Sequence, residues 1–148
     1  MPTQYGTVPD LSEIYRLIYV SQERQAITDA EIGHILDASL SNNYERFITG
    51  FLTHNHGRFM QVLEGPEDEV RGLFQTITED QRHACVTQIV GEHSDRRIFP
   101  DWSMNYFRVD NETGPPSMLV RTDEVEELMP ANTPKPVLYL FTRFMAQR

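Results

Sequence analysis

The sequence is 148 residues long, which is enough for one domain with its own hydrophobic core and too short for two ordinary domains. With 39% hydrophobic and 24% charged residues, the composition is that of a globular protein, not of a disordered or fibrous one. The formal net charge of −9 repels phosphate groups, which excludes nucleic acid and anionic membranes as expected partners.

The first two predicted elements are a strand and a helix. Residues 14–21 (IYRLIYVS) are mostly aromatic or β-branched, and both alternate sets of side chains are largely apolar, which is typical of a strand covered on both faces. Thr28 and Glu31 then form a capping-box pattern, and apolar residues follow at helical spacing. This predicts a helix of about 13 residues that closes at Asn42-Asn43.

A hairpin and a second helix are predicted next. Two short apolar runs, 48–54 and 58–64, are joined by the polar turn Asn55-His56-Gly57. Pro66 suits the first position of a helix, and an apolar stripe over 70–77 predicts that this helix is amphipathic. We interpret the acidic residues within 64–69 as the solvated start of that helix.

Two further strands, 86–91 and 102–109, complete the order β-α-β-β-α-β-β. This order favours an α+β, ferredoxin-like sheet with two helices on one face. Both faces of the 58–64 strand are mostly apolar, so the other face must also be covered. We expect the tail to cover it, as a C-terminal extension with helices at 117–129 and 137–147.

Gln61 is the clearest polar residue on an apolar face, because it alternates with Phe59 and Leu63 along one strand. A buried amide left unpaired costs about 1–3 kcal/mol per group. One interpretation is structural, with Gln61 bonded to backbone or to Tyr19. The other is that Gln61 and Tyr19 converge on a ligand.

Metal binding and catalysis are poorly supported by the sequence. Four histidines, two of them in the predicted hairpin tip (His54 and His56), lack a recurring spacing with carboxylates or thiols. They are His54, His56, His83 and His93. No nucleophile elbow or phosphate-binding loop is present, and Cys85 lacks an identifiable base, so we expect no metal and no enzyme activity.

Taken in order, six segments resemble the BLUF family of blue-light sensors that use flavin. They are RLIYVS (16–21), SLSNN (39–43), ITG (48–50), FMQVLEGP (59–66), DQRH (80–83) and RIFPDWSM (97–104). The resemblance implies a flavin-binding photosensor domain over residues 1–110 and a helical extension of the same unit over 111–148. It also implies a non-covalent flavin, FAD by family expectation with FMN as the alternative.

The resemblance further implies residue roles. Tyr19 matches the electron and proton donor, and Gln61 matches the amide between that tyrosine and the flavin. Trp102 and Met104 match the last-strand residues linked to signalling. Eight residues match the family's flavin-binding positions: Tyr19, Ile35, Ser39, Asn43, Gln61, Ile77, Arg82 and His83. Of the last two, Arg82 is the one expected to contact the edge of the flavin ring.

The expected function is therefore that of a cytoplasmic photoreceptor. The first residues contain no export leader, no run reaches the roughly 20 apolar residues of a spanning helix, and a lone cysteine fits a reducing compartment. About 95 residues of sensor leave too little chain for an effector by ordinary domain sizes. We expect output through the tail helices to a protein partner in trans or within a homo-oligomer. The alternatives are a light-insensitive interaction module with a vestigial flavin pocket and, less favoured, a flavin enzyme.

Overall fold

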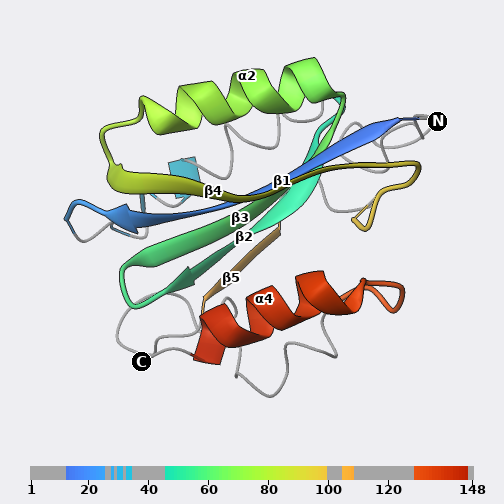
Figure 1. Ribbon diagram of the computed structural model, residues 1–148. Helices are drawn as coiled ribbons and strands as arrows, with labels where there is room; N and C mark the ends of the chain where they lie inside the picture. Colours follow the sequence, from blue (N-terminus) through green and yellow to red (C-terminus); the bar gives the residue numbers. More distant parts are fainter. Residues whose placement is uncertain are drawn as a thin grey trace.

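The part of the chain that the structure describes forms one five-stranded sheet, with strand order β4-β1-β3-β2-β5 (Figure 1). The computed structural model describes residues 13–25, 28, 30–31, 33–34, 46–99 and 129–146, together with the backbone of 105–108. The strands are β1 (Ile14–Glu23), β2 (Thr49–Asn55), β3 (Arg58–Gly65), β4 (His83–Ser94) and β5 (Asn105–Arg108). The helices are α2 (Glu67–Thr78) and α4 (Lys135–Ala146).

The pairing of the strands confirms the ferredoxin-like prediction. β1 lies between β3 and β4 and is antiparallel to both, and β2 is antiparallel to β3. β5 adds a parallel strand beyond β2. The first and third strands of the chain are therefore central neighbours, which brings residues more than 40 positions apart into direct register.

The predicted hairpin is confirmed, although its turn is shorter than expected. Asn55 still pairs with Arg58, so only His56 and Gly57 form the loop. Both have positive φ, 50° and 75°, which matches the two-residue turn whose twist suits a hairpin. Gly50 is required for a different reason, because a Cβ there would lie 1.9 Å from the Val62 carbonyl oxygen.

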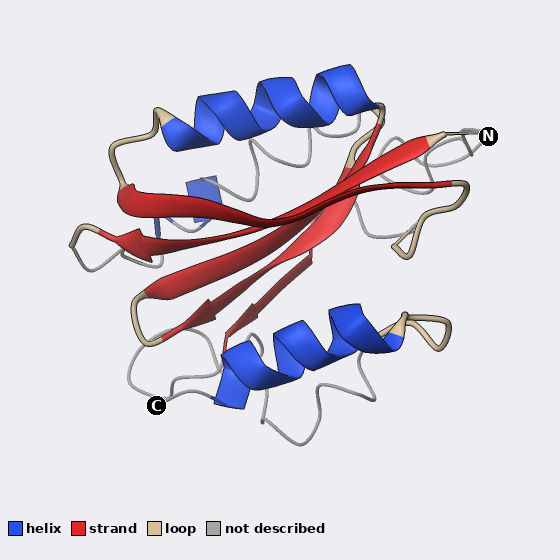
Figure 2. Ribbon diagram, viewed as in Figure 1, coloured by secondary structure: helices blue, strands red, loops and turns tan. Residues whose placement is uncertain are grey.

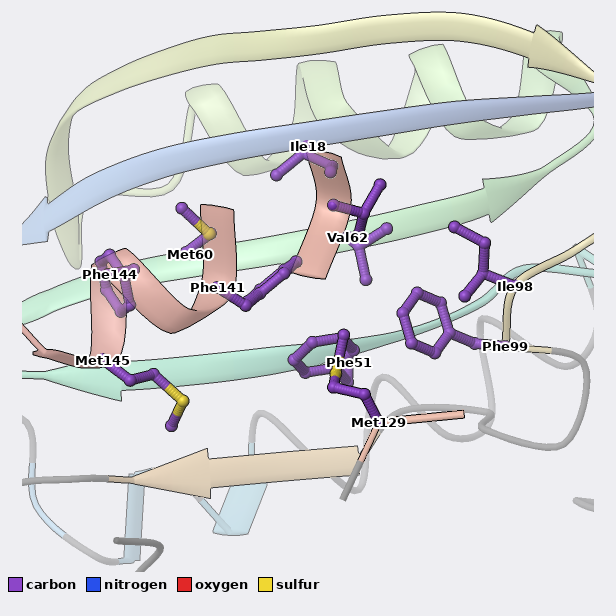
Figure 3. Packing of buried hydrophobic residues seen from close by; sticks show 11 residues of the cluster. Ile18, Phe51, Met60, Val62, Ile98, Phe99, Met129, Phe141, Phe144 and Met145 are labelled. Carbon is purple, nitrogen blue, oxygen red and sulfur yellow. The ribbon is translucent and has the colours of Figure 1, made fainter. Parts of the chain in front are cut away.

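Helices cover both faces of the sheet (Figure 2). On one face, the apolar stripe of α2 packs on alternate residues of β1, β2 and β3, among them Leu17, Leu52 and Leu63. On the other face, α4 packs on Ile18, Phe51 and other buried side chains, as Figure 3 shows. The prediction that the tail covers the second face is confirmed for α4.

The apolar side of α4 explains why it stays on the sheet. Val137, Phe141, Phe144 and Met145 are buried, and the Phe141 ring lies 4.4 Å from that of Phe51. Burial of such side chains contributes about 1.5–3 kcal/mol each. α4 begins two residues before the predicted start of this helix, at Lys135.

The predicted 66–77 helix is α2, with Pro66 as its N-cap residue and not its first helical residue. The predicted 86–91 strand extends at both ends to become β4, and the described part of the 102–109 strand is β5. The predicted 117–129 helix lies outside the described residues except for Met129, which is buried in the core under α4.

Only the start of the first predicted helix is described. The backbone of residues 30–31 and 33–34 is helical. The Thr28 hydroxyl accepts from the Glu31 N–H at 3.2 Å, and the Glu31 carboxylate accepts from the Thr28 N–H at 3.1 Å. The predicted capping box is therefore confirmed.

Across the residues described above, no helix is both long enough and apolar enough to cross a membrane.

Candidate functional site: a buried tyrosine–glutamine pair

Tyr19 and Gln61 form a hydrogen-bonded pair on the α2 face of the sheet. They are direct partners in the β1–β3 ladder, so the pleat directs both side chains to the same face. The Tyr19 hydroxyl donates to Gln61 Oε1 at 2.5 Å. Both side chains are buried, with exposed fractions of 3% and 7%. The structural interpretation of Gln61 is thus confirmed in that its amide is bonded to Tyr19.

Apolar side chains surround this pair. Phe59 and Leu63 flank Gln61 along β3, as the alternation predicted. From α2, the Phe74 ring lies 5.5 Å from the Tyr19 ring, and Ile77 packs against the same cluster. In such surroundings the Tyr19 phenol and the Gln61 amide have few other hydrogen-bond partners, which favours one defined geometry for the bond between them.

Burial raises the pKa of Tyr19 above its usual value, because the phenolate is poorly solvated there, and the Asp80 carboxylate raises that pKa further. Tyr19 is therefore a neutral phenol at physiological pH and acts as a hydrogen-bond donor to Gln61. Removing an electron from such a phenol makes it strongly acidic, so electron loss and proton loss at Tyr19 are expected to occur together.

His83 lies at the end of the site, where α2 leads into β4. Its Nδ1 is 2.9 Å from the Ser21 Oγ, and its Nε2 is 2.6 Å from the Ile77 carbonyl oxygen. A carbonyl only accepts, so Nε2 carries a proton. The ring stands edge-on to Tyr19 with a centroid separation of 6.4 Å. Protein oxygens therefore engage both ring nitrogens.

Arg82 is exposed and forms a fork with the carboxylate of Asp80. The Arg82 Nε lies 3.0 Å and 3.1 Å from the two Asp80 carboxylate oxygens. Hydrogen bonding to Arg82 lowers the pKa of Asp80, which stays ionised. Arg82, the predicted edge contact, is thus held beside Asp80, the carboxylate that raises the pKa of Tyr19.

The other predicted site residues lie outside the described part of the chain. They are Ile35, Ser39, Asn43, Trp102 and Met104. Of the eight predicted flavin-binding positions, the structure brings together Tyr19, Gln61, Ile77 and His83, with Arg82 at the margin.

Sequence reasoning missed a buried charge network on the opposite face. Glu64 is fully buried, so its interpretation as part of a solvated helix start is wrong. Its carboxylate accepts from Arg16 Nε at 2.8 Å and from the backbone N–H groups of Ile98 and Phe99. The signal was available in Arg16, because a cation inside a strand covered on both faces requires a buried partner.

Arg97, which lies between the two predicted strands 86–91 and 102–109, is also buried. It donates to the Thr49 hydroxyl at 2.9 Å and to the carbonyl oxygens of Glu64 and Phe47 at 2.8 Å and 2.6 Å. The network thereby fastens the segment after β4 to β2 and β3.

His54 also differs from its prediction. It lies within β2 and not in the hairpin tip, is buried, and stacks on Phe59 with ring centroids 4.4 Å apart. Its Nε2 is 3.3 Å from a Glu23 carboxylate oxygen. Among the described residues, no three His, Cys, Asp or Glu side chains gather as a possible metal site.

The fold and the site together define a class, an α+β sensor domain with a tyrosine–glutamine pair on the helix-covered face of a ferredoxin-like sheet. The chain belongs to the BLUF family, described as sensors of blue light using FAD, whose family model matches residues 14–105. The resemblance identified from the six motifs is confirmed.

Two curated relatives illustrate the family. The chain is 34% identical over 89 residues to photoactivated adenylate cyclase subunit beta of Euglena gracilis, a match that covers 60% of this chain and 10% of the relative. It is 30% identical over 91 residues to the blue light- and temperature-regulated antirepressor BluF of Escherichia coli (strain K12), covering 62% of this chain and 23% of the relative. The chain thus spans a small part of these relatives.

Solved structures show the same fold. The dark-state structure of BlrB, a BLUF protein, aligns with a TM-score of 0.66 at 31% identity and covers 91% of this chain and 96% of that one. Klebsiella pneumoniae BlrP1 with FMN and cyclic diGMP aligns with a TM-score of 0.75 at 29% identity, over 90% of this chain and 35% of that one. BLUF domains bind flavin, so the cofactor prediction is confirmed at the level of the family.

Proposed function

We propose that this chain is a blue-light photoreceptor that binds flavin non-covalently on the α2 face of its sheet and works as a sensor without turning over a substrate. The observation that carries the proposal is the buried hydrogen bond between Tyr19 and Gln61 on that face. Family membership over residues 14–105 supports it.

The chemistry of the described side chains fits a flavin ring. Gln61 supplies an amide with a donor and an acceptor end, and apolar groups such as Ile77 and Phe74 lie on the same face. Under the proposal, these groups hold the ring together with the positions matched from sequence, Ile35, Ser39 and Asn43. Because protein oxygens engage both nitrogens of His83, its role would be to shape the site more than to donate to the flavin.

Bound flavin supplies blue-light absorption and, once excited, a strong one-electron oxidant. Tyr19 would be the electron donor to that oxidant, and its phenolic proton, held in the 2.5 Å hydrogen bond to Gln61 Oε1, would move along that bond. When both return to Tyr19, no product is left behind. What can persist is a changed hydrogen-bond arrangement at Gln61.

Gln61 is the switch, since rotation or tautomerisation of its amide exchanges the acceptor and donor ends. The two arrangements differ in what the amide offers to Tyr19 and to its other neighbours. Trp102 and Met104, which match the family's signalling positions, would respond to this exchange. Two packings of this region are the bistable element that the sensor needs.

Output is proposed to leave through the C-terminal helices. α4 packs against the face of the sheet opposite Tyr19 and Gln61. A shift of the strands at this pair would therefore move side chains that α4 contacts. Relatives include a cyclase subunit and an antirepressor, which fits a sensor that serves different effectors. We place the effector in a separate cytoplasmic protein or in neighbouring copies within a homo-oligomer.

The deciding experiment is an absorption spectrum of the purified full chain before and after blue light. We expect a yellow protein whose flavin band shifts reversibly to the red. A protein that cannot be loaded with flavin, or that binds flavin and shows no shift, contradicts the proposal and favours the light-insensitive interaction module.

A further inference from the structure

A pocket of about 370 Å³ opens between α4 and the sheet, on the face away from Tyr19 and Gln61. It is formed where the end of β1 and the start of β4 meet the start of β3 and the last turns of α4. Its lining residues are Val20, Ser21, Gln22, Arg58, Met60, Cys85, Leu140, Arg143 and Phe144. Figure 3 shows two of them, Met60 and Phe144, on facing elements.

The chemistry of this lining contrasts with the rest of the chain. The formal net charge of the chain is −9, yet none of the nine described residues that line the pocket is acidic, and two are arginines. Arg143 is exposed in the last turn of α4. Arg58 reaches over the Phe144 ring, with 5.9 Å from its guanidinium carbon to the ring centroid. The pocket therefore combines an apolar wall with two cations.

The size of the pocket limits what it can hold. Small-molecule sites usually have volumes of about 300–1,000 Å³ and are mostly apolar with a few placed polar groups. The planar fork of arginine suits a carboxylate, which it can bind through two parallel hydrogen bonds.

We propose that this pocket binds a small amphipathic carboxylate, with an apolar body against Val20, Met60 and Leu140 and its acid group on Arg143. The site is distinct from the proposed flavin site. Val20 and Met60 pair directly in the ladder, one position along from Tyr19 and Gln61, and successive residues of a strand point to opposite faces. Its ligand would thus lie behind the photochemical pair, and its existence does not depend on the proposed photochemistry.

The chain carries its own reporter for the test, because Cys85 is its one cysteine, is exposed, and lines the pocket. The full-length protein is kept in the dark and alkylated with iodoacetamide at increasing concentrations of phenylbutyrate. Phenylbutylamine, with the same apolar body and the opposite charge, is the matched probe. We expect phenylbutyrate to slow alkylation saturably and phenylbutylamine to require at least about five times the concentration.

Three variants then test whether Arg143 supplies the positive charge that binds the carboxylate. Arg143→Gln should weaken protection by phenylbutyrate about five- to tenfold, the range expected for one partly exposed charged contact. Arg143→Glu should reverse the preference toward phenylbutylamine. Arg71→Gln, an exposed arginine on α2, is the control and should leave protection unchanged.

The proposal is overturned if Cys85 shows no saturable protection, if both probes protect equally, or if Arg143→Gln binds phenylbutyrate as tightly as the unchanged chain. The flavin spectrum is recorded in parallel. Loss of the light response with intact protection at Cys85 counts against the proposed function alone, and the reverse result counts against the pocket alone.

Discussion

Arg16 and Glu64 form an ion pair inside the protein, directly opposite one another in the β1–β3 ladder, with 2.8 Å between Arg16 Nε and Glu64 Oε2. Glu64 also accepts from the N–H groups of Ile98 and Phe99, so one carboxylate joins the centre of the sheet to the segment that leads toward β5. Such a buried pair is costly to break, because Arg16 then loses a fully buried carboxylate and keeps only the half-exposed carboxylate of Glu92 among its described ion-pair partners.

Replacing Glu64 with Gln is expected to destabilise the protein by about 3–5 kcal/mol, the range typical of breaking one side of a buried ion pair. The amide keeps one acceptor, but its NH₂ end meets donors that the carboxylate accepted from. The measurement is the free energy of unfolding in urea at neutral pH.

Glu69→Gln is the matched control for that substitution. Glu69 lies 3.6 Å from Arg46 and both side chains are largely exposed, so the change should stay within about 0.5 kcal/mol. Equal destabilisation by the two variants would show that the buried network contributes no more than a surface pair.

Gln61→Leu is expected to abolish the light-induced spectral shift while flavin remains bound. Leucine preserves the apolar volume beside Phe59 and Leu63 but has neither donor nor acceptor, so no hydrogen-bond exchange is possible. The shift and the flavin content are read from the same absorption spectra. Gln75→Leu, at an exposed position on α2, should cycle normally, and a normal cycle in Gln61→Leu refutes the assigned role.

Tyr19→Phe is expected to remove the light response, because the ring then has no phenolic proton and is a much poorer electron donor. Tyr15→Phe serves as the comparison, since Tyr15 is also buried on the α2 face of β1 and is not paired with Gln61. Transient absorption after a blue pulse measures the response of both variants. Persistence of the full response in Tyr19→Phe would transfer the donor role to another residue.

The raised pKa of Tyr19 also predicts a dependence of stability on alkaline pH. A folded-state pKa above the ordinary value of 10.0 means that the folded protein holds the phenolic proton more tightly than the unfolded chain does. The stabilisation is therefore complete below about pH 10 and is lost as pH rises toward the folded-state pKa.

Tyr19→Phe isolates that contribution. At neutral pH the variant should be less stable by about 1–3 kcal/mol, because Gln61 Oε1 loses its donor. Between about pH 9 and pH 11 the difference from the unchanged chain should shrink, because only the unchanged chain still has this proton to lose. Urea unfolding across this range measures it, and a difference that stays constant with pH would argue against the raised pKa.

The attachment of α4 to the hairpin gives a further prediction. Asn55 is fully buried, and its Nδ2 donates to the Phe144 carbonyl oxygen at 2.8 Å. Asn55→Ala should destabilise the protein by about 1–3 kcal/mol and raise amide exchange in the last turn of α4 more than in α2. Asn132→Ala, at an exposed position before α4, is the control. Unchanged exchange near Phe144 would mean that apolar packing alone holds the helix end.

The sequence by itself determined much of the local structure of this protein, and it predicted Tyr19 and Gln61 as the central pair of the site. Alternation along 14–21 and 58–64 predicted strands covered on both faces, and Thr28 with Glu31 predicted the capping box. These signals are local, because they arise from the periodicity of a strand or a helix and from contacts a few residues apart. Motif resemblance added Tyr19 and Gln61 as the functional pair, and the hydrogen bond between them is consistent with that assignment.

Only the tertiary structure decided which distant residues meet. The register of β1 with β3 places Tyr19 opposite Gln61 and, on the other face, Val20 opposite Met60. Long-range partners also decide whether a charge is buried. Glu64, which the sequence predicted at a solvated helix start, is buried because Arg16 and the 98–99 backbone surround its carboxylate. The pocket beside α4 also depends on the tertiary structure, because its wall combines residues of β1, β3, β4 and the C-terminal helix. Local sequence patterns do not predict how these distant elements lie relative to one another.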